Sequence, residues 1–312
     1  MMTGPALRYH GGKFRLAPWV TSFFPSHECY VEPFGGAASV LLQKPRSHAE
    51  VYNDLDDDIW NFFRVLRDPA LRSALEQACL LTPYSRREFE LAYEPTECQV
   101  ERARRTAIRA GMGFGSAGAT KAVTGFRTDT KRRHSTAQHL WTALPERLAL
   151  VGQRLAGVLL ENKDATEVML AHDAPTTLHF VDPPYLPETR TMRAGQTYYR
   201  HEMTPEQHGE LLESLDRLTG MVVLCGYPSA LYDERLPHWQ RHTTKARISG
   251  NRGTSHRTEV IWLNPACADA LDGCPGGLFA NLTNPKSQAD DMALSRAREI
   301  VGAALEPFVG AV

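Results

Sequence analysis

Short apolar runs that resemble buried strands recur along this chain, and each is followed by loop residues and a helical pattern. Such alternation favours an α/β fold, in which a mostly parallel sheet has helices on both faces. Ligands in these folds bind outside the carboxyl ends of the strands. We predict strands at Cys29–Val31, Glu50–Tyr52, Val158–Glu161, Leu178–Val181, Met221–Cys225 and Val260–Leu263.

Helical patterns are present at Arg15–Phe24, Asp57–Leu66 and Pro205–Leu218. The last begins with Thr204 as the predicted N-cap, and Gln207 completes a capping box. No apolar run approaches the ~20 residues that span a bilayer, and the N-terminus lacks a signal-peptide core. The six cysteines form no Cys-x-x-Cys pair. We therefore expect a cytoplasmic protein with no membrane span, no disulfide framework and no metal site.

Residues 68–150 interrupt the alternation and are read as an inserted helical module with glycine-rich loops. We divide the chain into 1–67, 68–150, 151–265 and a C-terminal extension at 266–312, which includes an amphipathic pattern at Ala289–Phe308 of unassigned role. Within the module, residues 101–134 carry nine Lys and Arg against two acidic residues. A local basic patch suits phosphate binding, although a solvated helix face explains it equally well.

An apolar strand enters the segment Val31–Ser39, which contains Phe34, Gly35 and Gly36. Adjacent glycines allow a tight turn and close approach of a ligand, but many α/β proteins have such turns without a cofactor. Asp54 follows Gly36 by 18 residues, which is the usual spacing for a ribose-binding acid. Asp57 or Asp58 is the expected cap of the next helix.

The tetrapeptide Asp182–Tyr185 (Asp-Pro-Pro-Tyr) directly follows a predicted strand. An amine conjugated to a purine is a poor nucleophile because its lone pair is delocalised into the ring. Asp182 and a carbonyl of Pro183 or Pro184 can engage both N–H bonds and orient the lone pair, while the prolines fix the backbone. Tyr185 offers a stacking face for an extruded base.

These motifs resemble those of the Dam-type DNA adenine methyltransferases, in the group whose cofactor motifs precede the catalytic motif. The resemblance spans about residues 5–265, and its order and spacing match. It rests on Arg8–Lys13, Val31–Gly36, Asn53–Asp54 and Asp182–Tyr185. It implies a Rossmann-like S-adenosylmethionine-dependent methyltransferase fold with a mixed, mostly parallel sheet and an inserted helical target-recognition domain.

The resemblance also implies roles for individual residues. Tyr9 would pack against S-adenosylmethionine, Lys13 would contact its carboxylate end, and Asp164 would bind its adenine amine. Asp182 would touch both the cofactor and the target amine. The implied cofactor-binding set is Tyr9, Lys13, Phe34, Gly35, Gly36, Asp54, Asp164 and Asp182, and the implied catalytic set is Asp182, Pro183, Pro184 and Tyr185.

The module would recognise double-stranded DNA through Arg105, Arg109, Lys121, Arg127, Lys131, Arg132 and Arg133. It lacks the Asn-rich stretch of the GATC-methylating members, so the target sequence stays open. The loop Glu188–Arg200 either closes over DNA or is a plain surface loop. Arg257–Val260 is also familiar from phage-like members and is given a structural role. A cognate restriction endonuclease is left open, and a monomer or weak dimer is expected.

The expected reaction is direct methyl transfer from S-adenosylmethionine to adenine N6. Methylation of cytosine N4 is the alternative within the same chemistry, although Asp182 favours adenine. No Pro-Cys dipeptide occurs, which disfavours attack on a cytosine ring carbon. A catalytically silent nucleic-acid-binding relative and an NAD-linked dehydrogenase are the alternatives from other classes.

Overall fold

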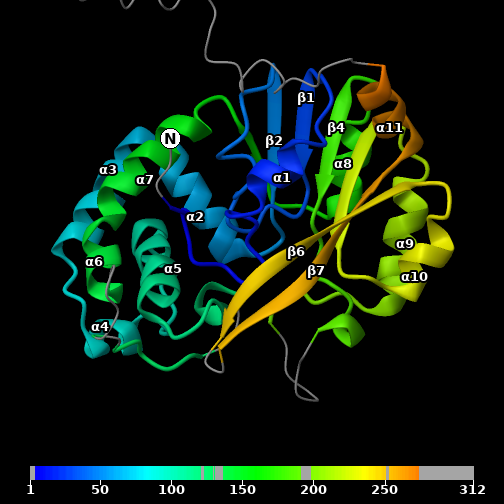
Figure 1. The fold of residues 1–312 in the computed structure, drawn as a ribbon. Helices are drawn as coiled ribbons and strands as arrows, with labels where there is room; N and C mark the ends of the chain where they lie inside the picture. The colour runs from blue at the N-terminus through cyan, green and yellow to red at the C-terminus, as the bar shows by residue number, and fades with distance from the viewer. Residues whose placement is uncertain are drawn as a thin grey trace, which may run out of the picture.

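The computed structural model describes residues 4–120, 123–128, 130, 136–190, 198–250 and 253–273. Within these residues one sheet has the strand order β3-β2-β1-β4-β5-β7-β6 (Figure 1). Its strands are β1 (Cys29–Glu32), β2 (Ala49–Asn53), β3 (Leu159–Glu161), β4 (Thr177–Val181), β5 (Met221–Gly226), β6 (Gln240–Gly250) and β7 (Gly253–Leu263). All six predicted strand positions are occupied by strands of this sheet.

The sheet is mixed because β1 to β5 pair in parallel, whereas β7 pairs antiparallel with both β5 and β6. Parallel strands need cover on both faces, which explains their continuous apolar character. The α/β prediction with a mixed, mostly parallel sheet is therefore confirmed. β6 was missed because its first half, Gln240–Lys245, is polar and largely exposed at the edge of the sheet, so it has no apolar run to signal a strand.

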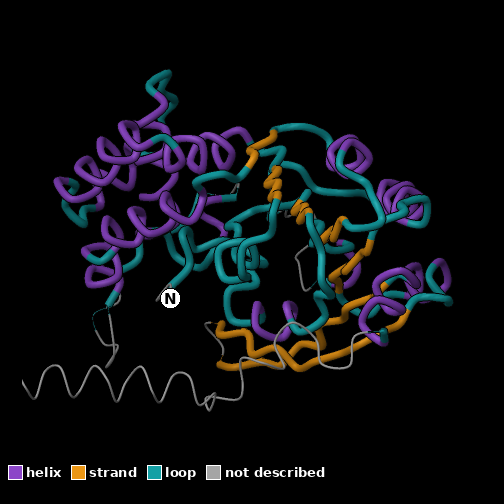
Figure 2. Tube along the Cα trace, turned by 90° about the horizontal axis from the view of Figure 1, so that it is seen from above, coloured by secondary structure: helices purple, strands orange, loops and turns teal. Residues whose placement is uncertain are grey.

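Helices cover the sheet and extend beyond its β3 end (Figures 1 and 2). The α-helices are α1 (Ala17–Thr21), α2 (Asp57–Arg67), α3 (Pro69–Leu81), α4 (Arg86–Leu91), α5 (Gln99–Met112), α6 (Ala137–Thr142), α7 (Leu144–Leu155), α8 (Ala165–Ala171), α9 (Pro205–Leu215), α10 (Ala230–Arg235) and α11 (Pro265–Asp272). Single 3-10 turns occur at η1 (Ala117–Ala119) and η2 (Pro187–Thr189). The predicted capping box of Thr204 and Gln207 is present at the start of α9. No helix in the described ranges is both long and apolar enough to cross a membrane.

The helices α3 to α7 form a group on one side of the molecule (Figure 1). α2 packs against α5 and α7, and one apolar cluster runs from the sheet through α2 into this group. The predicted boundary at residue 67 falls between α2 and α3, while the boundary at 150 lies inside α7. The predicted boundary between residues 265 and 266 lies inside α11, which packs on β5 and β7. The pattern at Ala289–Phe308 lies outside the described residues.

The chain that follows β1 forms turns and no helix. Gly36 and Ala38 both have positive φ, at 48° and 52°. A non-glycine residue in this region interrupts a right-handed helix. The segment is therefore a compact loop that carries its backbone N–H groups to the carboxyl edge of the sheet.

Candidate active site

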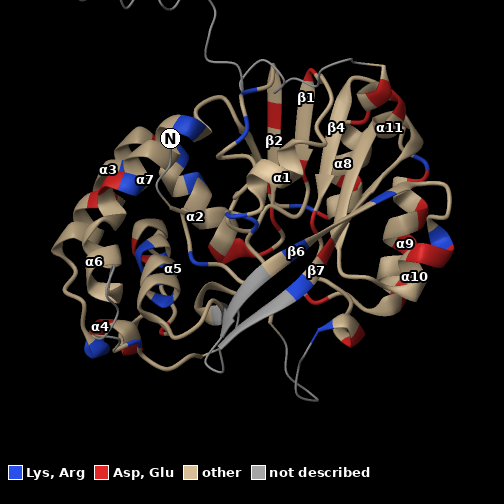
Figure 3. Ribbon diagram, viewed as in Figure 1, with Lys and Arg blue, Asp and Glu red and all other residues tan. Residues whose placement is uncertain are grey.

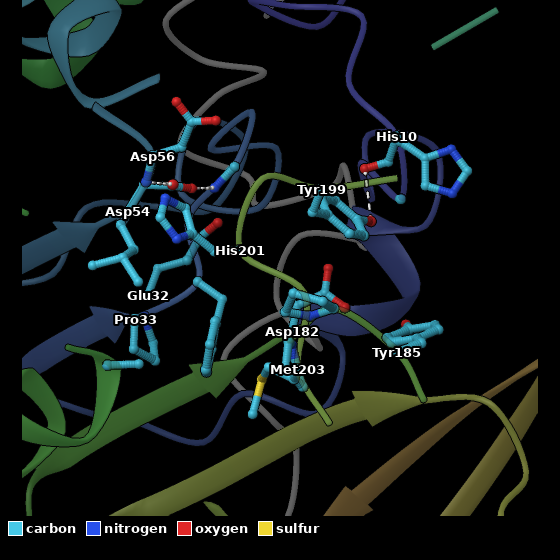
Figure 4. Close-up of a pocket in the computed structure, with 18 of the residues that line it drawn as sticks. His10, Glu32, Pro33, Asp54, Asp56, Asp182, Tyr185, Tyr199, His201 and Met203 are labelled. Atoms are coloured by element: carbon cyan, nitrogen blue, oxygen red, sulfur yellow. Dashed lines mark hydrogen bonds between the residues drawn. The ribbon is translucent and has the colours of Figure 1, made fainter. Parts of the chain in front are cut away.

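A cavity of about 630 Å³ lies at the carboxyl ends of the parallel strands. Every residue of the predicted cofactor-binding and catalytic sets lines it, from Tyr9 to Tyr185. Figure 4 shows Asp54 and Asp56 on one side of the cavity, with Asp182 and Tyr185 on another. Segments far apart in the sequence thus meet where the topology of a parallel sheet predicts a ligand site.

The glycine turn is shaped by two tyrosines that leave no room for a side chain. A Cβ atom on Gly35 would lie 2.1 Å from the Tyr52 ring, and one on Gly36 would lie 2.8 Å from the Tyr9 ring. The Gly36 N–H donates to Asp54 Oδ2 at 2.7 Å. Glycine is required here for both the close approach and the positive φ.

Asp54 is buried beside this turn, 9% exposed, and also accepts a hydrogen bond from the Asp56 N–H at 2.8 Å. Burial raises the pKa of Asp54 to about 7, and the nearby charge of Asp56 acts in the same direction. The hydrogen bonds from Asp56 and Gly36 oppose that rise because they stabilise the carboxylate. This carboxyl group therefore titrates near neutral pH.

The predicted helix cap was wrong, because Asp56 and neither Asp57 nor Asp58 is the N-cap of α2. Asp56 Oδ1 accepts from the backbone N–H groups of Asp58 and Ile59 at 2.9 and 3.4 Å. Asp56 has the extended backbone of a cap, with φ −77° and ψ 110°, whereas Asp57 and Asp58 are already helical. The Asp58 carboxylate instead pairs with Arg102, Arg109 and Arg200.

The buried Lys13 and the partly buried Asp182 form an ion pair inside the cavity. Lys13 Nζ lies 2.9 Å from Asp182 Oδ1 and 3.0 Å from Oδ2, and it also donates to the Gly11 carbonyl at 3.1 Å. Burial lowers the pKa of Lys13, but the charges of Asp182 and Glu259 and the hydrogen bond to Asp182 together outweigh it, and the pKa is raised. Asp182 is thus held as a hydrogen-bond acceptor directly after β4.

Tyr185 is 9% exposed, and its ring has two close neighbours. Lys13 Nζ lies 4.8 Å from the ring centre, and the Tyr227 ring meets it edge-on at 4.6 Å between centres. The Tyr185 hydroxyl donates to Glu259 Oε2 at 2.9 Å. Glu259 and Tyr227 were not predicted as site residues, although the familiar segment Arg257–Val260 offered a signal for Glu259.

The described end of the loop after the catalytic motif lies over the cavity. Tyr198 stacks on His10 with ring centres 4.0 Å apart, and the Tyr199 hydroxyl donates to the His10 carbonyl at 3.2 Å. Arg200 pairs with Asp56 at 2.8 Å. Sequence reasoning also missed His10. The predicted Glu188–Arg200 loop therefore contacts the N-terminal segment and α2, while residues 191–197 lie outside the described part of the chain.

Glu32, at the end of β1, is another cavity residue that the sequence did not reveal. It is 2% exposed and accepts hydrogen bonds from the Tyr30 hydroxyl at 2.7 Å and the Leu41 N–H at 3.0 Å. Burial raises the pKa of Glu32 to about 8. Asp164, in contrast, is exposed and caps α8 with Oδ1.

The three predicted DNA-binding arginines that the structure describes, Arg105, Arg109 and Arg127, do not form one exposed patch. Arg105 pairs with Glu101 at 2.7 Å, while Arg109 is 9% exposed and pairs with Asp58 at 2.8 Å. Arg127 is 5% exposed. Figure 3 marks the basic positions of α5, the helix that packs against α2 and α6.

The burial of Arg109 and Arg127 favours a structural role for both over direct phosphate contact. A charge count along the sequence cannot distinguish an interior ion pair from an exposed cation. The remaining predicted cations lie outside the described residues, and they are Lys121, Lys131, Arg132 and Arg133.

The chain is similar in sequence to DNA adenine methylases. A DNA adenine methylase of Salmonella typhi is 23% identical over 264 residues, which covers 82% of this chain and 92% of that protein. A DNA adenine methylase of Haemophilus influenzae is 38% identical over 66 residues, which is 20% of this chain and 22% of that protein. A solved precorrin 8w decarboxylase from Methanobacterium thermoautotrophicum is 12% identical, covering 80% of this chain and 89% of that one, but its TM-score of 0.31 supports no argument.

The family described as D12 class N6 adenine-specific DNA methyltransferase matches residues 9–224, which include the glycine turn, Asp54 and the whole Asp182–Tyr185 motif. This agrees with the predicted fold class and reaction, and it sets aside the cytosine and dehydrogenase alternatives. The chain belongs to the D12 class of N6 adenine-specific DNA methyltransferases.

Proposed function

We propose that the cavity binds S-adenosylmethionine and that Asp182, with a carbonyl of the adjacent prolines, orients the N6 amine of an adenine in double-stranded DNA. The volume of about 630 Å³ lies within the range of roughly 300–1,000 Å³ that small-molecule pockets have. A cofactor of this size and part of a purine can share such a space. The adenine must leave the duplex to reach it.

The residues present suit the chemical groups of S-adenosylmethionine. Asp54 offers a carboxylate to ribose hydroxyls, while the turn at Gly36 lets a ligand approach the backbone. Lys13 is a buried cation for the carboxylate end. Apolar contact comes from Tyr9 and Phe34, and Asp164 caps α8 through Oδ1 alone, which leaves its other carboxylate oxygen for an adenine amine.

The chain's own contribution to the reaction is to bind and orient the amine. Bound S-adenosylmethionine supplies an electrophilic methyl group. The Asp182 carboxylate accepts a hydrogen bond from one N–H of the adenine amine, and a prolyl carbonyl accepts one from the other N–H. The lone pair of the amine nitrogen therefore points toward the methyl carbon. Lys13 offsets the negative charge of the partly buried Asp182. The walls of the cavity keep water from competing for these hydrogen bonds.

The observation that carries this proposal is the placement of Asp182 in the same cavity as Gly36 and Asp54. The test is to incubate the protein with duplex DNA and S-adenosylmethionine that carries a deuterated methyl group, then digest the DNA to nucleosides for mass spectrometry. We expect deuterated N6-methyladenine. Label in N4-methylcytosine, or no labelled nucleoside, would overturn the proposal.

We also propose that the module at residues 68–150 recognises the target DNA. Its support is the position of α3 to α7 at one end of the sheet, together with four of the nine cations in residues 101–134, because the four arginines of α5 form ion pairs and Arg127 is buried. The cations outside the described residues, Lys121, Lys131, Arg132 and Arg133, are the candidates for phosphate contact.

A further inference from the structure

Glu259 is a buried carboxylate that has no role in the reaction described above. It lies on β7, opposite Thr244 of β6, and is 7% exposed at the wall of the cavity. A buried carboxylate needs a hydrogen-bond partner or an ion pair to offset the loss of water. Its partner is the hydroxyl of Tyr185, which donates to Glu259 Oε2 at 2.9 Å.

This hydrogen bond ties the antiparallel end of the sheet to the catalytic motif. Tyr185 comes three residues after Asp182, and both side chains approach the same atom, Lys13 Nζ, at 4.8 Å from the ring centre and 2.9 Å from Oδ1. Tyr227 closes on the ring edge-on at 4.6 Å. Because the Tyr185 hydroxyl is hydrogen-bonded to Glu259, the ring is held at its hydroxyl end as well as by its contacts with Lys13 and Tyr227.

We propose that Glu259 is a positioning residue for methyl transfer, which acts through the Tyr185 hydroxyl to hold the ring beside the reacting amine. The inference rests on the proposed role of the Asp182–Tyr185 motif. Burial raises the pKa of Glu259, while the charge of Lys13 lowers it, so the two groups share one electrostatic environment. Its effect reaches the reaction through the hydrogen bond from the Tyr185 hydroxyl.

The test compares Glu259→Gln, Glu259→Leu, Tyr185→Phe and the Tyr185→Phe/Glu259→Leu double variant with the wild-type protein. A glutamine carbonyl still accepts from the Tyr185 hydroxyl, although the charge is lost, whereas leucine leaves that hydroxyl without its acceptor. Glu213→Leu is the matched control, since the Glu213 side chain is 55% exposed on α9. Single-turnover transfer is measured per molecule competent to bind S-adenosylmethionine, which separates rate from folding.

We expect Glu259→Leu to lower the rate of transfer about tenfold, with unchanged affinity for S-adenosylmethionine. Glu259→Gln should retain most of the rate, and Glu213→Leu should retain all of it. In the Tyr185→Phe background, Glu259→Leu should have no further effect, because the hydrogen bond is already absent. Thermal unfolding should show the double variant recovering stability lost in Glu259→Leu, since both partners are then apolar.

The proposal is overturned if Glu259→Leu lowers only the unfolding temperature and leaves the per-site rate unchanged. It is also overturned if the effects of Glu259→Leu and Tyr185→Phe multiply, or if Glu259→Gln is as slow as Glu259→Leu. Asp182→Ala in the same assay keeps the two proposals separate. Activity in that variant, or none in the wild-type protein, counts against the proposed function and not against the link between Glu259 and Tyr185.

Discussion

Lys13 and Asp182 lie 169 residues apart in the chain, and their charged groups meet 2.9 Å apart inside the cavity. The N-terminal segment brings the cation, and the end of β4 brings the carboxylate. The pair joins the proposed cofactor site to the proposed catalytic group, so replacing either residue should affect both binding and transfer.

Replacing Lys13 with methionine removes the buried cation and leaves Asp182 without its charge partner. We expect affinity for S-adenosylmethionine to fall about tenfold, equivalent to about 1.4 kcal/mol, together with a slower transfer. Isothermal titration measures the affinity. Lys245→Met, which removes an exposed lysine on β6, is the control. Unchanged binding in Lys13→Met would remove Lys13 from the cofactor site.

Asp54 should make cofactor binding depend on pH. Burial raises its pKa to about 7, and the ionised form accepts more strongly from ribose hydroxyls. Affinity should therefore increase as pH rises from 6 to 8. In Asp54→Asn the affinity should be weaker and this rise should vanish, which titrations at three pH values can show. The same rise in Asp54→Asn would assign it to another group, of which Glu32, with its pKa raised to about 8, is the first to test.

Asp58 should stabilise the folded protein because three arginines converge on its carboxylate. Arg102 and Arg109 come from α5, while Arg200 comes from the loop over the cavity. Removing one partner of a largely buried pair costs about 3 kcal/mol, so Asp58→Ala should lower the free energy of unfolding by about that amount. Denaturant unfolding measures it. The exposed neighbour Asp57 provides the control variant Asp57→Ala, and equal losses in the two variants would contradict this role.

Acid should remove the contribution of the Asp58 carboxylate to the free energy of unfolding. Burial would raise the pKa of Asp58, but the hydrogen bond from Arg102 and the charges of Arg109 and Arg200 lower it to about 2. The unfolded chain binds its proton near pH 4, so the stabilisation is complete above that pH and is lost as pH falls toward 2. The stability difference between wild type and Asp58→Ala should therefore shrink over this interval. A constant difference would show that the carboxylate charge is not its source.

Arg132 and Arg133 should support DNA affinity through phosphate contacts. The Arg132→Ala/Arg133→Ala variant should bind duplex DNA more weakly, and the slope of log affinity against log salt should decrease by about 2. Fluorescence anisotropy over a salt series measures both. Arg217→Ala/Arg235→Ala removes the same charge from the α9 and α10 side. If both pairs change the slope equally, net charge explains the effect and the two residues belong to a solvated face.

The strands and the cofactor motifs were predictable because their signals are local. Six apolar runs mark strands, of which all but the edge strand β3 are mostly buried, and the turn at Gly35–Gly36 and the Asp182–Tyr185 motif have fixed order and spacing. The order of strands then brings these motifs together without further information. The edge strand β6 was not predictable, since its first half, Gln240–Lys245, is polar and has no apolar run to detect.

Contacts between distant side chains account for most of what the sequence did not reveal. The role of Asp56 as cap depends on the residue at which α2 begins, and three adjacent aspartates leave that choice open. The burial of Arg109 depends on Asp58, 51 residues earlier in the chain. Likewise, the partner of the Tyr185 hydroxyl is Glu259, 74 residues later. Only the assembled sheet brings the two together.

The account depends most on Asp182, and the rate of methyl transfer by Asp182→Ala tests it most directly. Single-turnover transfer to duplex DNA should be followed as N6-methyladenine by mass spectrometry, with Asp182→Asn as a second variant that preserves the size of the side chain. We predict no detectable N6-methyladenine from Asp182→Ala, which should stay folded and bind DNA, although its unfolding temperature should fall because the buried Lys13 loses its charge partner. Transfer at the wild-type rate by a folded Asp182→Ala protein would contradict the account.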